Sequence, residues 1–475
     1  MSRPRRQGRA ARTLPAAAIG SRGGCGLTAP QGEPASMAAD RPGGGRPSGR
    51  RARTGQGGMA DMGACEGVAA VPSGASRRTV HLAVLIALFG LVLAATALRF
   101  ALEPPGPAAR SPVDFDAFRL AGDLVRQGRI ELAYRFSEFQ GLLQAEFGGT
   151  PFLPWTYPPP FDLVVAPLAL LPVWLGYAVF MGGTLWGFLA ALRRLAPDGA
   201  VPALILFTPV VLVTLRCGQN GLLTGALIAW ACCGLLAGRT WAGVPLGLMV
   251  IKPHLAVAFA AYVVLSGRWS VAATAVATAL SVSLAATVAL GPDVWIALAG
   301  SIREAKMFLA DGYYPLFRMV SPYAALHTLG AGPTVAMAGQ VAVALLALAV
   351  VAWASLRLPL RHALGVTAVA SLLISPYAYD YDLTIVAVGL ALLLPDLMRC
   401  GRPGERGAVY ALCVVAGGFG LAQSAVLSAR FGPVPELVPG DMPLSLSGLC
   451  LVALLGLLVG ILARARRAEP ALTVR

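Results

Sequence analysis

Long apolar runs separated by short polar connections follow one another along the chain after residue 78. A helix needs about 20 apolar residues to cross the hydrocarbon core of a bilayer. One run is unusually long and is broken at Leu171-Pro172, which predicts a short helix followed by a full one. With this break, the pattern predicts an all-α polytopic membrane protein with about twelve transmembrane helices. The apolar runs occupy 81–101, 161–192, 200–216, 218–237, 241–265, 269–291, 333–356, 361–376, 380–397, 407–427 and 443–463.

Arginines flank both ends of this series. Arg77-Arg78 precede the first run, and Arg464, Arg466 and Arg467 follow the last. Cytoplasmic loops carry the excess of positive charge in membrane proteins. Both ends are therefore expected in the cytoplasm, with the first loop, 102–160, outside a cell (inner) membrane.

The middle of the series fits this scheme less simply. Arg357 and Arg361 favour the cytoplasm and so place the 292–332 loop outside. Arg193-Arg194 also favour the cytoplasm, yet a regular zigzag from there puts 292–332 on the wrong side. A broken or re-entrant segment near Lys252-Pro253 would restore the order.

Two of the expected external loops are too long to be simple connections. Loop 102–160 contains helical stretches from Asp116 to Arg129 and from Glu131 to Phe147, and loop 292–332 contains an amphipathic stretch from Val294 to Leu309. Long ordered loops are usually functional, and amphipathic helices lying in the interface suit an active site that faces lipid. The alternative is that these helices serve surface packing alone.

Composition agrees with lipid as the solvent. The 475 residues are 56% hydrophobic and 13% charged, against about a quarter charged in soluble domains. The net charge of +15 does not indicate nucleic-acid binding, because residues 1–78 hold +9 of it. The eight cysteines show neither a metal-ligand spacing nor a disulfide framework, so no metal and no cofactor is expected.

Three regions follow from these patterns. Residues 1–78 are rich in Gly, Pro, Ser, Ala and Arg without apolar periodicity, which predicts a disordered basic tail. Met59 and Met62 precede the first span, and a true start there is the alternative to a genuine cytoplasmic arm. Residues 79–465 form the transmembrane domain, and 466–475 form a cytoplasmic tail.

Acids are scarce beyond the tail, so those near the spans are candidates for chemistry. Asp114 and Asp116 follow the first span. One of them is a candidate general base at the membrane surface, whereas a helix cap is the structural alternative for the other.

Two polar interruptions accompany them. The segment from Trp155 to Phe161 has an extended, proline-rich entry with Tyr157 among aromatics typical of the headgroup level. Gln219 and Asn220 lie between two glycines and two apolar runs, and such groups are costly in hydrocarbon unless they are paired. A structural corner is the simpler interpretation of the second interruption.

Lys252 is the most informative single residue. The chain has only two lysines, and this one lies inside an apolar run, followed by Pro253 and His254. A cation in a span is by default a hypothesis of function. It predicts a clamp on an anionic lipid phosphate with His254 nearby, and a lysine that snorkels to the surface is the alternative.

A last polar group lies between two apolar runs near residue 380. The stretch from Ser375 to Asp382 contains Tyr379, Asp380 and Asp382, which are candidates for catalysis or acceptor binding. Either acid could instead cap the following helix. Arg318 and His327 belong to the same expected external face, and Arg318 is the second candidate for phosphate binding.

Taken in order, these segments resemble the polytopic glycosyltransferases of family 87, which include polyprenol-phosphate-mannose-dependent mannosyltransferases. The resemblance covers roughly residues 80–400. The residues that carry it are Asp114-Phe115, Phe118, Ala121, Gly128, Tyr134, Tyr157-Pro158-Pro159, Gly218-Gln219-Asn220, Lys252-Pro253 and Ser375-Pro376.

The resemblance implies a C-type glycosyltransferase fold with its active site on the extracytoplasmic side. It implies transfer of a hexose from a polyprenyl-phosphate donor to a hydroxyl of a lipid or glycan acceptor, with inversion. Asp114 would be the base, and Lys252 and Arg318 would meet the phosphate. Mannosyltransferase members tend to carry histidine in the segment that matches 379–382, and this chain has none there.

Two other classes remain open. Broken helices and a buried lysine would also serve a transporter or lipid flippase, although the sequence shows no internal repeat and its polar groups concentrate on the external face and not at the midplane. A non-catalytic membrane scaffold is the third class. Convergence of Asp114, Lys252 and Asp380 on one outward-facing cavity would favour the transferase.

Overall fold

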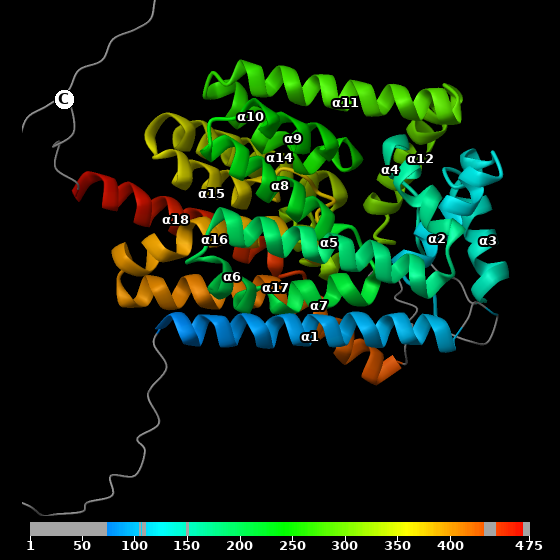
Figure 1. Ribbon diagram of the computed structural model, residues 1–475, viewed down its shortest axis with the longest axis horizontal. Helices are drawn as coiled ribbons and strands as arrows, with labels where there is room; N and C mark the ends of the chain where they lie inside the picture. The colour runs from blue at the N-terminus through cyan, green and yellow to red at the C-terminus, as the bar shows by residue number, and fades with distance from the viewer. Residues whose placement is uncertain (1–73, 104–105, 107–110, 149–151, 432–442, 469–475) are drawn as a thin grey trace, which may run out of the picture. The chain divides into compact units, whose positions relative to one another are not determined.

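The computed structural model describes residues 74–103, 106, 111–148, 152–431 and 443–468 (Figure 1). Nearly all of the expected basic tail and most of the C-terminal tail lie outside these residues. Within them, every regular element is helical apart from one isolated β-bridge between Met319 and Tyr379. The expectation of an all-α protein is confirmed.

The long helices are those with the apolar length to cross a bilayer. Among the described residues, seven pass this test, and α6 and α7 together form an eighth candidate with a 65° bend. The longer helices are α1 (Gly74–Leu102), α5 (Val173–Leu195), α11 (Trp269–Leu290), α14 (Pro333–Arg357), α16 (Thr384–Cys400), α17 (Pro403–Phe431) and α18 (Ser447–Ala468), and the bent pair is α6 (Ala200–Leu206) and α7 (Thr208–Cys217).

The expected count of about twelve spans is not shown, because several apolar runs fold into helices that are too short. A crossing needs about 20 residues, whereas the run 218–237 forms the 16-residue α8 and the run 361–376 forms the 12-residue α15. The structure therefore supports a multi-pass helical membrane protein with seven or eight candidate spans. The short elements are α8 (Gly221–Leu236), α9 (Gly243–Leu248), α10 (Val257–Leu265), α13 (Pro322–Thr328) and α15 (Leu360–Ser371).

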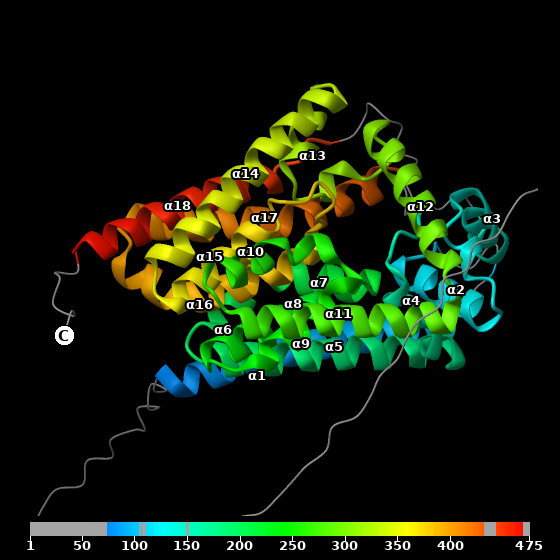
Figure 2. The same ribbon diagram turned by 90° about the horizontal axis from the view of Figure 1, so that it is seen from above.

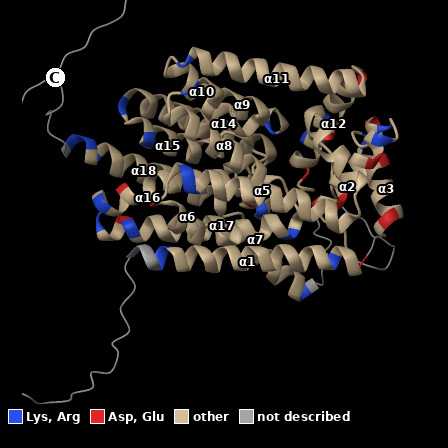
Figure 3. Cartoon of the chain, in the orientation of Figure 1, with Lys and Arg blue, Asp and Glu red and all other residues tan. Residues whose placement is uncertain are grey.

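Basic residues are most frequent at one end of the long helices, whereas basic and acidic residues are mixed at the other end (Figure 3). Arg78 at the start of α1 pairs with Asp198 just beyond α5, and Arg464 near the end of α18 pairs with Glu405 at the start of α17. Arg466 donates to the carbonyl of Arg357 at the end of α14. The start of α1 and the end of α18 therefore share one end, as two cytoplasmic ends would.

The break expected near Lys252 is present. The chain leaves the end of α8 through α9 and two 3₁₀ turns, Met249–Ile251 and Pro253–Leu255, and Lys252 between them has φ −144° and ψ 68°. It then returns through α10 to Arg268, whose guanidinium donates to the carbonyl of Leu235 in α8 (3.5 Å). Residues 240–265 are thus a hairpin with Lys252 at its tip.

Three helices occupy the loops where sequence predicted them: α2 (Asp114–Arg126), α3 (Phe136–Phe147) and α12 (Asp293–Ala310). They gather with α4 (Pro159–Val165) at the end opposite the start of α1 and the end of α18 (Figure 2). The backbone N–H of Phe136 donates to Glu304 (3.2 Å), and Ser301 donates to the carbonyl of Trp155 (2.5 Å). The 102–160 and 292–332 segments therefore lie on the same side of the bundle.

Candidate active site

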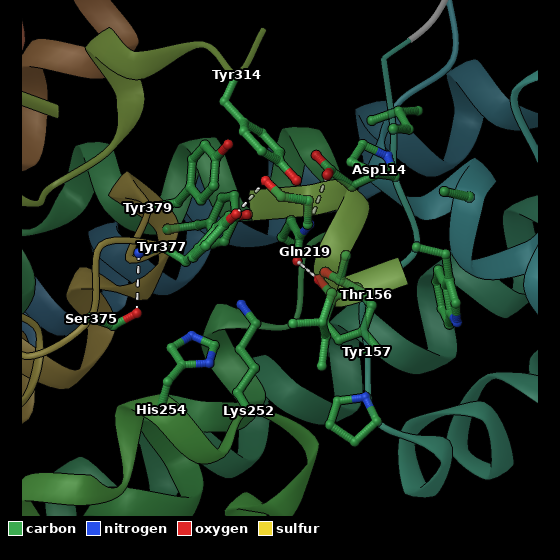
Figure 4. Close-up of a pocket in the computed structure, with 18 of the residues that line it drawn as sticks. Asp114, Thr156, Tyr157, Gln219, Lys252, His254, Tyr314, Ser375, Tyr377 and Tyr379 are labelled. Atoms are coloured by element: carbon green, nitrogen blue, oxygen red, sulfur yellow. Dashed lines mark hydrogen bonds between the residues drawn. The ribbon is translucent and has the colours of Figure 1, made fainter. Parts of the chain in front are cut away.

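A cavity of about 480 Å³ opens at the end where α2 and α12 lie (Figure 4). This volume is within the range of small-molecule sites. The start of α2, the 152–158 segment and α12 form one part of its wall. The Gln219 turn, the tip of the 240–265 hairpin and the segments around Arg318 and Tyr379 complete it.

The two acids at the start of α2, Asp114 and Asp116, lie in different surroundings. The backbone N–H of Val113 donates to the carboxylate of Asp116 (2.8 Å), so Asp116 caps the helix and is buried away from the cavity. Asp114 lines the cavity instead. The helix is anchored by Phe115, which packs edge-on against Tyr177 of α5 at 5.4 Å between ring centroids.

Gln219 fixes the Asp114 carboxylate. Its amide N–H donates to Asp114 Oδ1 (2.7 Å), while its carbonyl oxygen accepts from the Tyr157 hydroxyl (3.0 Å). The turn that carries it needs its glycines, because Gly218 has φ +71° and a Cβ on Gly221 would lie 2.1 Å from the carbonyl oxygen of Tyr381. Asn220 is buried next to Gln219 and does not line the cavity.

Several charges act on Asp114. Burial raises its pKa above the ordinary 3.8, and the charges of Arg318 and Lys252 together with the Gln219 hydrogen bond oppose this rise. Burial also raises the pKa of Tyr157. A carboxyl group with a raised pKa, facing a cavity, has the properties of a general base.

Lys252 reaches the cavity from the hairpin tip, and its side chain is only 7% exposed. Its Nζ lies 2.8 Å from Asp382 Oδ1 and 4.8 Å from the ring centroid of Tyr381. The buried ion pair does not fit a lysine that snorkels to the surface. His254, two residues further along the chain, lines the same cavity.

Arg318 reaches the cavity from the opposite wall. Its Nε and Nη2 both lie 3.0 Å from the carboxylate of Asp380, which makes a bidentate pair. Burial opposes the charged form of Arg318, but the charge and hydrogen bond of Asp380, together with the charges of Cys217 and Asp114, raise its pKa above the ordinary value. Asp380 and Asp382 are both buried behind the cations and do not line the cavity.

The sequence-predicted residues thus fall into two groups. Those that line the cavity are Asp114, Tyr157, Gln219, Lys252, His254, Arg318 and Tyr379. Those that lie outside its wall are Asp116, Asn220, His327, Asp380 and Asp382. His327 contacts the carbonyl of Ala310 (3.2 Å) and the ring of Tyr323, which are structural contacts.

Sequence reasoning did not single out Lys306 and Tyr314, which also belong to the wall. Lys306, on α12, also lines the cavity, so the only two lysines of the chain are found there. That scarcity was the signal that could have identified it. Tyr314 and Tyr377 contribute aromatic surface, and their rings meet edge to face at 5.6 Å.

The described residues contain no group of three His, Cys, Asp or Glu side chains that could hold a metal ion. The charged groups that line the cavity are instead one carboxylate and three cations: Asp114, Lys252, Lys306 and Arg318. Such a site can remove a proton and bind an anion within the same cavity.

Comparison with known proteins identifies the family. Residues 155–376 match glycosyltransferase family 87, a stretch that includes Gln219, Lys252 and Arg318, whereas Asp114 precedes it. No curated protein and no solved structure matches the chain. The chain therefore carries a glycosyltransferase family 87 domain over residues 155–376, within a multi-pass helical membrane protein.

Proposed function

We propose that this protein transfers a hexose, mannose-like, from a polyprenyl-phosphate donor to the hydroxyl of a lipid or glycan acceptor. The observation that carries the proposal is the convergence of Asp114, Lys252 and Arg318 on one cavity from three distant parts of the chain. Family membership supports a sugar donor and an acceptor. A C-type glycosyltransferase fold for residues 79–465 belongs to the same proposal.

In the proposed reaction each of these groups has one role. Asp114 takes the proton of the acceptor hydroxyl while that oxygen attacks the anomeric carbon. The bond from the anomeric carbon to the phosphate oxygen breaks, and the configuration at that carbon inverts. The polyprenyl phosphate leaves with one additional negative charge, which Lys252 and Arg318 stabilise because they are already in place.

A donor panel tests this function. The purified protein in lipid nanodiscs is incubated with labelled polyprenyl-phosphate mannose, polyprenyl-phosphate glucose, GDP-mannose or UDP-glucose, and with membrane lipid extract as acceptor. We expect labelled glycolipid only from a polyprenyl-phosphate sugar, and none from the Asp114→Asn protein. Transfer from a nucleotide sugar in the absence of a lipid-linked one would contradict the proposal.

We further propose that the cavity faces the extracytoplasmic side of the inner membrane. The arginine-rich end of the helices then lies in the cytoplasm, as the positive-inside rule requires. This side would bring a membrane-borne donor and an external acceptor to the same opening.

Cysteine labelling tests this orientation. In a protein whose Cys25 and Cys65 are replaced by serine, Ser137→Cys on the exposed face of α3 should react with a membrane-impermeant maleimide in intact cells. Cys400, exposed at the end of α16, is the internal control and should react only after permeabilisation. The reverse pattern would exclude the proposed orientation.

A further inference from the structure

The two deep cations of the cavity are held by a single short turn. This turn is the 3₁₀ element η7 (Asp380–Leu383), which directly precedes α16. Asp382 pairs with Lys252 across 130 residues of sequence, and Asp380 pairs with Arg318 across 62. Both carboxylates are only 1% exposed.

Tyr381 lies between the two pairs. Its ring centroid is 4.8 Å from Lys252 Nζ and 5.8 Å from Arg318 Cζ. Tyr381 lines the cavity, whereas its two acidic neighbours do not. The turn thus presents an aromatic ring with both cations close to it, while the two counter-charges lie outside the cavity wall.

The turn itself is tightly held. The second oxygen of Asp382 accepts from the backbone N–H of Tyr379 (3.1 Å), and Asp380 Oδ1 accepts from the N–H of Tyr381 (2.9 Å). Thr384 donates to the carbonyl of Gly221 (2.6 Å). Backbone hydrogen bonds within the turn therefore fix each carboxylate independently of its cation.

Fixed carboxylates reduce two energetic costs of placing the cations in the cavity. Lysine and arginine side chains have many rotamers, and ordering them for each phosphate would reduce affinity. A buried cation without a partner is also strongly disfavoured. Pairing with a rigid turn removes both difficulties and sets the distance between the two charges.

We infer that Asp380 and Asp382 are positioning residues that hold Arg318 and Lys252 close to Tyr381 to receive an anionic phosphate. This inference rests on the proposed function, because it assumes that the two cations bind the donor phosphate. It gives these acids a role distinct from catalysis or acceptor binding, and also from capping alone.

Binding of farnesyl phosphate to the full chain in nanodiscs tests the inference without any transfer reaction. The variants are Lys252→Met, Asp382→Asn, Asp380→Asn, and two doubles: Lys252→Met/Asp382→Asn and Lys252→Met/Asp380→Asn. Melting temperatures report whether each protein is folded. Asp396→Asn is the matched control, since Asp396 lies on α16 near its other end and pairs with His362 and Arg399.

Asp382→Asn should raise the Kd about tenfold, within the range of coupling between contacting residues. Lys252→Met/Asp382→Asn should bind no more weakly than Lys252→Met alone, because Asp382 acts only through this lysine. Lys252→Met/Asp380→Asn should instead show the product of the two single effects. Asp382→Glu, which keeps the charge, should recover part of the binding, and Asp396→Asn should bind normally.

The outcomes distinguish a failure of this inference from a failure of the proposed function. If Lys252→Met binds farnesyl phosphate normally, the phosphate clamp of the proposed function fails. If Lys252→Met binds weakly while a folded Asp382→Asn binds normally, only the positioning role fails. Equal losses in both doubles, without dependence on which partner is removed, would indicate a general structural effect and would also overturn the inference.

Discussion

Replacing Asp114 with asparagine is expected to slow glycosyl transfer by about 10²–10⁴-fold, the usual contribution of a positioned general base. Asparagine keeps the size of the side chain and can still meet Gln219, whose N–H now donates to Asp114 Oδ1. It cannot accept the proton of an acceptor hydroxyl. The measurement is the initial rate of label transfer at saturating donor, beside the melting temperature.

Asp116→Asn is the matched control for this loss. Asp116 is the N3 residue of α2 and accepts the N–H of the N-cap residue Val113, and the amide oxygen of asparagine can accept the same hydrogen bond. This variant should therefore retain both transfer and stability. Near-normal transfer by Asp114→Asn would remove the base from this position.

The pH dependence gives a second signature of the same base. Because burial raises the pKa of Asp114, the carboxylate is the form lost as pH falls through a value above 3.8. Transfer should therefore rise with pH along a limb displaced upward from an ordinary aspartate. The residual transfer of Asp114→Asn should lack this limb, and an unchanged limb would assign it to another group.

Replacing Lys252 with methionine should weaken donor binding by about 1–3 kcal/mol, the scale of a hydrogen bond to a charged group. The structure adds a cost that sequence alone did not suggest. Asp382, paired with Lys252 at 2.8 Å, would remain buried without its partner, and breaking such a pair costs about 3–5 kcal/mol of stability. The donor Kd should therefore rise above the native value, and the melting temperature should fall below it.

A double variant separates the two effects. Lys252→Met/Asp382→Asn removes both charges, so its melting temperature should recover while its donor Kd stays weak. Recovery of donor binding together with stability would show that Lys252 supports the fold and not the phosphate. Arg194→Met, a cation of α5 at the arginine-rich end, should leave donor binding unchanged.

Sequence predicted the parts of the site that depend on unusual residues in unusual places. Lys252 in an apolar run, Gln219 between glycines and Asp114 after the first span all line the cavity. The role of Asp380 and Asp382 could not be read, because each pairs with a cation far away in the chain. Such pairings depend on tertiary packing, which local composition does not encode.

The number of spans could not be predicted from local sequence for a related reason. Hydropathy detects an apolar run but not whether it crosses, and α15 has only 12 residues. The loop helices were better predicted, since α3 and α12 follow from periodicity within their own segments. Their shared contact through Phe136 and Glu304 was not foreseeable from either segment.

The 240–265 hairpin affects how the orientation of each later helix across the membrane is determined. A segment that enters the bundle and returns to its own side adds apolar length but leaves the parity of the crossings unchanged. The helices from α11 onward thus keep the same direction whether or not the hairpin is present. A hairpin can therefore place a cation in the cavity without changing the orientation of the later helices across the membrane. A lysine on an additional full span would instead reverse the orientation of every helix that follows it.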